Sequence, residues 1–331
     1  MKRKIKLFFT DFWPTFNIGK NYFTDLLSIN YDIEITDDKP EFLIYSCFGF
    51  QFQKFNCIRI FFTGENFRPN LNECDYSFSF DYSDNPRCFR LPLYTLYFDL
   101  DNLTKKKNVD ELMTHKNKFC NFIYSNPTPK KRIEFFRKLN KYKKVDSGGR
   151  VLNNLGYNVV NKIEFLKNYK FTIAFESESY PGYTSEKIIE PMIAGSLPIY
   201  WGNEFIGRDF NTNSFLNLND FHSDEEMIEK IIELDNNDEL YKQYLIQPWF
   251  NNNKINEFAN KNEIIKKFDR IFNEKIIPVS NQSKVFSKNL IINKFTLLKI
   301  FFKYYLRILL HKIINFSFRK FKIKFDKIRG E

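Results

Sequence analysis

The densest group of chemically capable residues in this chain surrounds Lys187. The sequence Thr184-Ser185-Glu186-Lys187 has the hydroxyl residues and the first-turn acid that are typical of a helix start. A lysine in a first helical turn lies at the positive end of the helix dipole, which disfavours it. A bound phosphate removes this penalty, because free N–H groups, the dipole and the ammonium then all attract one anion. Lys187 is therefore either an anion-binding residue or an ordinary solvated lysine.

A second candidate is the carboxylate of Glu65. It follows the apolar run 58–63 and the flexible Gly64, so we expect it at the C-terminal end of a strand. Open α/β sheets bind ligands at that edge, although a lone carboxylate in a turn is more often simply solvated. Asp99 and Asp101 have the spacing of a metal-binding Asp-x-Asp pair. Such pairs are common by chance, so this one is weak evidence of a metal site.

Around these residues the chain alternates β-type runs with helical segments. The runs 171–175 and 197–201 enclose the helix that begins near Lys187, which is the repeating unit of a parallel α/β sheet. Pro191 lies inside that helix and is expected to kink it or restart it. Further strands are predicted at 5–9, 41–45, 58–63 and 119–124, and helices at 20–27, 132–142 and 224–234.

Composition narrows the function classes. The net charge is +11, but 13 Lys or Arg residues stand between 284 and 329, opposed only by Asp326 and Glu331 to the end of the chain. The remainder is near neutral, which argues against a nucleic-acid-binding surface. The 5 cysteines form no CxxC or Cys/His pattern, so they predict reduced thiols rather than disulfides or a zinc site.

Segment 171–202 resembles the donor-binding signature of the α-1,3/4-fucosyltransferases, glycosyltransferase family 10. That signature runs approximately F-x-I-A-F-E-N, G-Y-x-T/S-E-K-I and A-G-x-x-P-I-Y-W-G, and this chain reads FTIAFESESYPGYTSEKIIEPMIAGSLPIYWG. Further matches in family order lie upstream, namely Thr63-Gly64-Glu65-Asn66, Ser125-Asn126, Arg132 and Val145-Asp146-Ser147-Gly148-Gly149. So many ordered matches, over about residues 55–225, are far more specific than one short motif.

The resemblance implies a GT-B fold, in which two Rossmann-like domains face each other across a cleft. We expect an acceptor-side domain at 1–145, a GDP-fucose-binding domain at 146–270 and a basic helical tail at 271–331. The resemblance also implies an inverting transfer of L-fucose from GDP-β-L-fucose. The acceptor would be a GlcNAc-containing glycan such as N-acetyllactosamine, with α-1,3 or α-1,3/4 linkage, in lipopolysaccharide or another surface glycan.

The resemblance assigns roles to single residues. Glu65 would be the base that activates the acceptor, and Arg132 and Lys187 would contact the donor diphosphate. Donor-binding residues with less defined roles complete the set, namely Ser125, Ser177, Tyr183 and Glu186. Ser177 replaces the Asn that is common in the family, so the hydrogen bonds to the donor can differ. No obligatory metal is expected, because the two cations do the work of a divalent ion.

The segment 289–316 is apolar but interrupted by cations. Lys299, Lys303 and Arg307 recur every four residues, on one face of a predicted helix beside an apolar stripe. This pattern favours a basic amphipathic helix at an anionic membrane surface, continued by the basic residues up to 329. The alternative is a helix packed on the protein's own core.

The start of the chain predicts a first strand rather than a signal peptide, because the apolar run 5–9 is too short. We therefore expect a cytoplasmic enzyme on the inner face of the cytoplasmic membrane. No heptad repeat supports dimerisation, and the oligomeric state stays open. Two alternatives also stay open: a related transferase that uses another nucleotide sugar, and a non-catalytic membrane- or glycan-binding protein.

Overall fold

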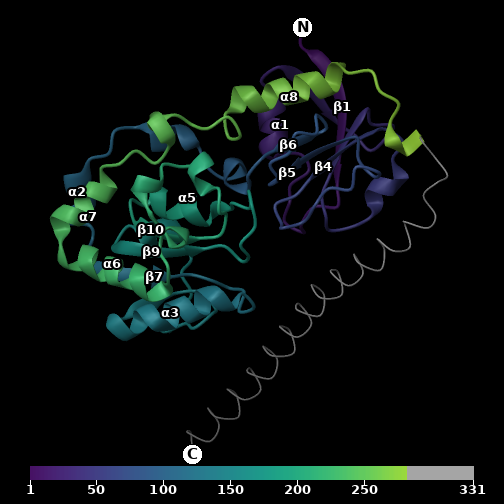
Figure 1. Ribbon diagram of the computed structural model, residues 1–331. Coiled ribbons are helices and arrows are strands. Elements are labelled where there is room, and N and C mark those ends of the chain that lie inside the picture. Colours follow the sequence, from purple (N-terminus) through teal and green to yellow (C-terminus); the bar gives the residue numbers. More distant parts are fainter. Residues whose placement is uncertain (282–331) are drawn as a thin grey trace, which may run out of the picture. The chain divides into compact units, whose positions relative to one another are not determined.

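The computed structural model describes residues 1–281, and its first sheet is parallel throughout (Figure 1). Its strand order is β2-β1-β3-β4-β5-β6. The strands are β1 (Arg3–Thr10), β2 (Tyr31–Ile35), β3 (Phe42–Tyr45), β4 (Ile58–Phe62), β5 (Tyr76–Ser79) and β6 (Cys88–Arg90). In the register of the central strands, Leu7 pairs with Phe42 and Ile60 pairs with Tyr76. Side chains alternate between the faces, so Phe62 enters one core and its neighbour Phe61 enters another.

A second parallel sheet follows, with the strand order β11-β10-β9-β7-β8. Its strands are β7 (Lys118–Phe122), β8 (Val145–Ser147), β9 (Tyr169–Phe175), β10 (Leu197–Trp201) and β11 (Leu216–Asn217). The central strand β9 is buried along most of its length, as expected for a parallel sheet that is covered on both faces. Two parallel sheets with covering helices confirm the predicted fold class, a pair of Rossmann-like domains.

Helices connect the strands of both sheets. They are α1 (Tyr22–Leu27), α2 (Val109–Thr114), α3 (Lys130–Tyr142), α4 (Lys162–Leu166), α5 (Glu186–Ile193), α6 (Asp224–Asn236), α7 (Asp238–Leu245) and α8 (Lys261–Asn273). Short 3-10 turns lie between them, at η1 (Gln51–Lys54), η2 (Leu93–Leu96), η3 (Leu100–Thr104), η4 (Ile206–Arg208), η5 (Thr212–Ser214), η6 (Leu218–Asp220), η7 (Asn251–Asn253) and η8 (Val279–Asn281). Most helices begin after a capping Asn or Ser, as Asn21 and Ser223 do for α1 and α6.

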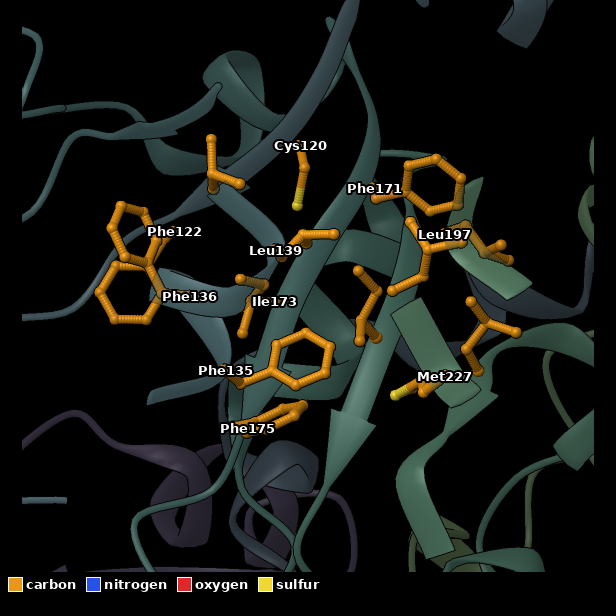
Figure 2. Packing of buried hydrophobic residues seen from close by; sticks show 14 of the residues in the cluster. Cys120, Phe122, Phe135, Phe136, Leu139, Phe171, Ile173, Phe175, Leu197 and Met227 are labelled. Carbon is orange, nitrogen blue, oxygen red and sulfur yellow. The ribbon is translucent and has the colours of Figure 1, made fainter. Parts of the chain in front are cut away.

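The second sheet has different helices on its two faces. On one face, Phe135 and Phe136 of α3 pack against β9 and β7, with ring centroids 4.8 Å from Phe175 and 4.8 Å from Phe122 (Figure 2). On the other face, α5 packs with residues of β9 and β10 and with the turns η2 and η3. The segment 93–104 is therefore held against the helix that carries Lys187.

The chain returns to its first domain at α8. Ile264, Phe268 and Phe272 are buried in the same core as β1, β3 and β4, and the Phe268 ring stacks on Phe78 at 4.7 Å. In Figure 1, α8 lies alongside α1, and the two helices are in contact. The last helix of the described chain therefore completes the domain that the first strand begins.

The predicted domain boundary at 145/146 falls inside the second sheet. β7 belongs to that sheet although it lies before the boundary, because it pairs with both β8 and β9. The predicted end of the second domain at 270 likewise falls within α8, which packs on the first sheet. Local sequence pattern located β7 but did not predict α8, and the sheet to which each belongs depends on long-range contacts.

Single elements agree with their predicted positions. Predicted strands at 5–9, 41–45, 58–63 and 119–124 lie at β1, β3, β4 and β7, and the predicted helices lie at α1, α3 and α6. Pro191 does not restart its helix, because α5 is continuous through it and ends at Ile193. The predicted membrane-surface helix at 289–316 lies outside the described residues.

Candidate active site

A cleft of about 600 Å³ brings together residues from both domains. Its lining includes six of the predicted site residues, namely Glu65, Arg132, Ser177, Tyr183, Glu186 and Lys187. The volume lies in the range that is usual for small-molecule sites. Ser125 is not among the lining residues and is exposed, whereas its neighbour Asn126 does line the cleft. Further lining residues that we did not predict are Gly64, Leu93, Tyr97, Phe98, Ser185 and Glu190.

Glu65 lies in a tight turn directly after β4. Its N–H donates to the buried Thr63 Oγ1 at 3.0 Å, and the Thr63 hydroxyl donates to the Glu65 carbonyl at 3.0 Å. At Gly64 an added Cβ would lie 2.8 Å from Leu93 Cδ1, so a larger residue would push the Leu93 side chain, which also lines the cleft, out of its place. The turn therefore fixes the Glu65 backbone, while the residue itself stays exposed at the cleft.

The N-terminus of α5 is organised by a buried carboxylate, Glu176. This residue ends β9, is 0% exposed, and accepts hydrogen bonds from Ser185 N at 2.7 Å and from Ser185 Oγ at 2.7 Å. Ser185 is the N-cap residue, yet its side chain makes no capping bond to the helix. The N-terminus of α5 therefore lacks a cap from the Ser185 side chain, and the positive end of its dipole can attract an anion.

Lys187 lies between two carboxylates. Its Nζ is 3.1 Å from Glu176 Oε2 and 3.5 Å from Glu186 Oε1, and it donates to Ser185 Oγ at 2.7 Å. Burial lowers the pKa of Lys187, but the two carboxylates raise it more, so the pKa lies well above its usual value. Burial raises the pKa of Glu186, but the charges of Lys187 and Lys162 lower it by more, so the pKa lies below its usual value. The Lys187 ammonium and the Glu186 carboxylate are therefore expected to be charged at neutral pH.

Arg132 is a buried cation without a carboxylate partner among the described residues. Its residue is 3% exposed, its guanidinium lies 4.1 Å from the centroid of the Tyr124 ring, and Nη2 donates to the Asn126 carbonyl at 2.6 Å. Its Nε is buried with no hydrogen-bond partner in the described chain. Burial lowers the pKa of this guanidinium, although an arginine keeps its proton in proteins. A buried charge left unpaired is costly, which indicates an anionic ligand.

Tyr183 is fixed by both domains. Its hydroxyl lies 3.2 Å from Ser177 Oγ, and its ring packs at right angles to Phe80 of the first domain, with centroids 4.8 Å apart. Gly182 has a φ of +87°, and an added Cβ there would lie 2.1 Å from the Phe80 carbonyl oxygen. Only glycine allows this approach, so Gly182 sets the position of the tyrosine that follows it.

Two polar links hold the domains together beside the cleft. Arg90 of β6 is buried and donates through Nη2 to Asp209 Oδ2 at 2.7 Å and to the Gly182 carbonyl at 2.9 Å. Nearer to Glu65, Asn66 Nδ2 donates to Glu178 Oε2 at 2.7 Å. The loop that carries Glu65 is therefore joined directly to the loop that follows β9.

The Asp-x-Asp pair does not take part in the cleft. Asp99 Oδ1 lies 3.5 Å from Lys261 Nζ, and neither Asp99 nor Asp101 is among the lining residues. Within residues 1–281, no cluster of three or more His, Cys, Asp or Glu side chains is arranged to hold a metal ion. No helix in that range is long and apolar enough to cross a membrane.

Sequence reasoning assigned no role to two kinds of residue at the site, a buried carboxylate that contacts lining residues and an apolar part of the lining itself. Glu176 was visible only as the end of a strand, and its contact with Ser185 requires the whole loop between them to fold. Leu93, Tyr97 and Phe98 lie in and after a 3-10 turn, where neither helical nor strand periodicity gives a signal. The local hint that this segment is buried is its composition, because residues 91–98 read LPLYTLYF.

Comparison with known proteins gives one consistent result. Residues 7–97 match the model of the α-(1,3)-fucosyltransferase FucT N-terminal domain, and residues 113–285 match that of the glycosyltransferase family 10 (fucosyltransferase) C-terminal region. An α-(1,3)-fucosyltransferase FucT of Helicobacter pylori is 37% identical over 209 residues, which are 53% of this chain and 44% of that protein.

Two further relatives extend this result. The crystal structure of an α1,3-fucosyltransferase with GDP-fucose superposes with a TM-score of 0.73 at 29% identity, over 84% of this chain and 93% of the other. A mouse 4-galactosyl-N-acetylglucosaminide 3-α-L-fucosyltransferase 9 is 28% identical over 132 residues, which are 39% of this chain and 36% of that enzyme. The chain thus spans less than half the length of the two curated relatives.

Proposed function

Because this chain belongs to glycosyltransferase family 10, the fucosyltransferases, we propose that it transfers L-fucose from GDP-fucose to a glycan hydroxyl with inversion at the sugar carbon. The observation that carries the proposal is Arg132, a buried guanidinium with no carboxylate partner among the described residues, beside Lys187 and an uncapped helix N-terminus. The relative with GDP-fucose in its crystal structure supports the choice of donor.

The donor half of the reaction needs stabilisation of a departing diphosphate. Arg132 offers a planar set of donors and Lys187 a compact charge, and both line the cleft beside the first turn of α5. Fixed positive groups of this kind stabilise charge that develops on the leaving oxygen, without reorganising during the step. Glu176 positions Lys187 and Ser185, so we assign it a positioning role rather than a catalytic one.

The acceptor half needs a base for the attacking hydroxyl. Glu65 is the carboxylate of the first domain that lines the cleft, opposite the groups on α5. In the proposed step, its carboxylate accepts the hydroxyl proton, the acceptor oxygen bonds to C1 of fucose, and the bond from C1 to the diphosphate oxygen breaks. One such displacement converts a β-linked donor into an α-linked product. GDP is the other product.

We propose an α-1,3 linkage to GlcNAc in an N-acetyllactosamine-type acceptor. The names of the bacterial and mouse relatives both specify attachment to a 3-hydroxyl, and the mouse name specifies a galactosyl-GlcNAc acceptor. We further propose that no divalent metal is required, because Arg132 and Lys187 supply the charge that a metal would otherwise provide. A role in lipopolysaccharide or another surface glycan remains part of the proposal.

The proposal is tested by transfer from GDP-fucose to N-acetyllactosamine and to its isomer lacto-N-biose, with and without EDTA, with the product linkage read by NMR. We expect an α-1,3-fucosylated N-acetyllactosamine, formed at the same rate in EDTA. Failure to bind or turn over GDP-fucose would overturn the function. Loss of activity in EDTA that Mn²⁺ or Mg²⁺ restores would overturn the metal-independent mechanism alone.

We also propose, from sequence alone, that residues 289–329 bind anionic membranes and place the enzyme on the inner face of the cytoplasmic membrane. The support is the spacing of Lys299, Lys303 and Arg307 beside an apolar stripe. The full chain should co-sediment with vesicles that contain anionic lipid, and binding should weaken as salt rises. Equal binding to neutral vesicles, or none to either kind, would contradict this proposal.

A further inference from the structure

The apolar side chains of the cleft come largely from one short segment. Leu93, Tyr97 and Phe98 line the cleft together, and we call these three residues the apolar wall. The rest of the lining consists of charged and polar residues, a glycine, and Tyr183, whose hydroxyl is engaged with Ser177. The cleft therefore has one apolar surface within an otherwise polar site.

The apolar wall is held in place from behind. Tyr94, between Leu93 and Tyr97, is fully buried, and its hydroxyl accepts a hydrogen bond from Asn256 Nδ2 at 2.9 Å. Phe98 packs against the buried cluster that contains Ile188 and Ile189 of α5. Tyr97 nevertheless stays 52% exposed. An aromatic ring that a rigid segment holds open to a cleft is typical of a ligand contact.

Tyr97 lines the same cleft as Glu65 and Lys187, the residues to which we assign the transfer. Burial raises the pKa of its phenol, and so do the charges of Glu186 and Glu65, while Lys187 lowers it. The charge of the proposed base, Glu65, and the charge of the proposed diphosphate-binding residue, Lys187, therefore both act on the phenol. Under the proposed reaction, the transferred sugar must lie between these groups.

Fucose differs from most hexoses at one carbon that an apolar surface can recognise. It is a 6-deoxy sugar, so its C6 is a methyl group rather than a hydroxymethyl group. A methyl gains free energy when it leaves water for an apolar surface, whereas a hydroxyl there loses its hydrogen bonds to water. We propose that the apolar wall binds the C6 methyl of the transferred sugar and sets donor selectivity against 6-hydroxy sugars. This inference rests on the proposed function.

The test compares two donors that differ only at C6. GDP-L-galactose is GDP-fucose with a hydroxyl on C6, and we expect kcat/KM to favour GDP-fucose by about 10- to 100-fold in the unchanged protein. Tyr97→Ser and Leu93→Ser should each lower this ratio about fourfold, the value of one buried methyl. Tyr97→Phe keeps the ring and should keep the ratio. A ratio that stays within twofold in both serine variants would overturn the apolar wall.

Two controls make the result specific. Tyr157→Ser alters a tyrosine that is 56% exposed and outside the cleft lining, and its donor ratio should equal that of the unchanged protein. An equal change in Tyr157→Ser would also overturn the inference. Because both donors use the same base, a general loss of activity in Leu93→Ser cancels in the ratio. If the unchanged protein does not use GDP-fucose, the proposed function itself fails, which is a distinct outcome.

Discussion

The two sides of the cleft are built by different means. On the donor side, Glu176 and Arg132 are 0% and 3% exposed, and Glu176 links β9 to Ser185 and Lys187. On the acceptor side, Glu65 is exposed, and its turn is fixed by the Thr63 hydroxyl. The proposed donor side is therefore organised by buried contacts within the protein, whereas the proposed base of the acceptor side is exposed at the cleft.

This difference follows from what each side must do. Buried charges are tolerated only where partners compensate for lost hydration, so the donor side needs a network or a ligand for every charge. A base that receives a proton from a large glycan must stay accessible instead. Substitutions on the two sides should accordingly change different quantities, namely stability and donor affinity on one side and turnover on the other.

The largest effect is expected on the acceptor side. Glu65→Gln removes the proposed base but keeps the size of the side chain, so kcat should fall by at least about 100-fold. The affinity for GDP-fucose, measured by calorimetry, should stay within twofold, because the donor side is untouched. A parallel loss of turnover and donor affinity would show that Glu65 serves donor binding, and the contrast between the two sides would fail.

The next effect concerns stability. Glu176→Gln leaves the partly buried Lys187 with Glu186 as its one remaining ion-pair partner among residues 1–281, so the free energy of unfolding should fall by about 3 kcal/mol. Urea denaturation measures this change. Glu204→Gln, at an exposed position, serves as the control and should stay within about 0.5 kcal/mol. An unchanged stability for Glu176→Gln would mean that the carboxylate network is not structural.

A smaller effect, on donor affinity, is expected for Arg132, one of the two cations proposed to bind the diphosphate. Arg132→Lys keeps the charge but loses the planar fork and its packing on Tyr124, so the Kd for GDP-fucose should rise about tenfold. Arg137→Lys, at an exposed position on the same helix, should leave the Kd unchanged. Equal Kd values for both variants would show that Arg132 does not bind the donor.

The smallest effect is expected from pH. The pKa of Lys187 is raised well above its usual value, so the ammonium keeps its charge until pH rises through that raised value. The pKa of Glu186 is lowered, so its carboxylate keeps its charge until pH falls through that lowered value. Between pH 6 and 8 both charges persist, and the Kd for GDP-fucose should vary less than twofold. A larger drift would reveal a titrating group on the donor side.

The same contrast explains what the sequence could predict. The helices α3 and α6 and the start of α5 follow from local pattern. Ser223 caps α6, Pro129 and Ser185 precede α3 and α5, and the apolar spacing is encoded within a few positions. Glu65 and Lys187 could be placed at strand and helix ends for the same reason, and the resemblance supplied their roles. The roles of Glu65 and Lys187 stay predictions.

Other features required long-range contacts. The placement of β7 in the second sheet depends on its pairing with β8 and β9, which no window of sequence reveals. The apolar spacing of Ile264, Phe268 and Ile271 marks α8 as amphipathic, but it does not say which sheet the helix covers. Short strands such as β5, which reads YSFS, alternate aromatic and polar residues over too few positions to predict a strand, and the burial of Ser77 and Ser79 on its polar side is not evident from the sequence.

The return of α8 to the first sheet sets an order of assembly on the ribosome. The core around β1 and β3 includes Phe268 and Phe272, so it cannot close until the last helix has emerged from the exit tunnel. The core around β7 and β9 uses residues only from 109 to 245 and can close earlier. One core of the domain translated second can therefore close before the core of the first domain, which reverses the usual N-terminal-first order for these two cores. Until α8 is synthesised, the first sheet lacks the helix that covers this apolar face.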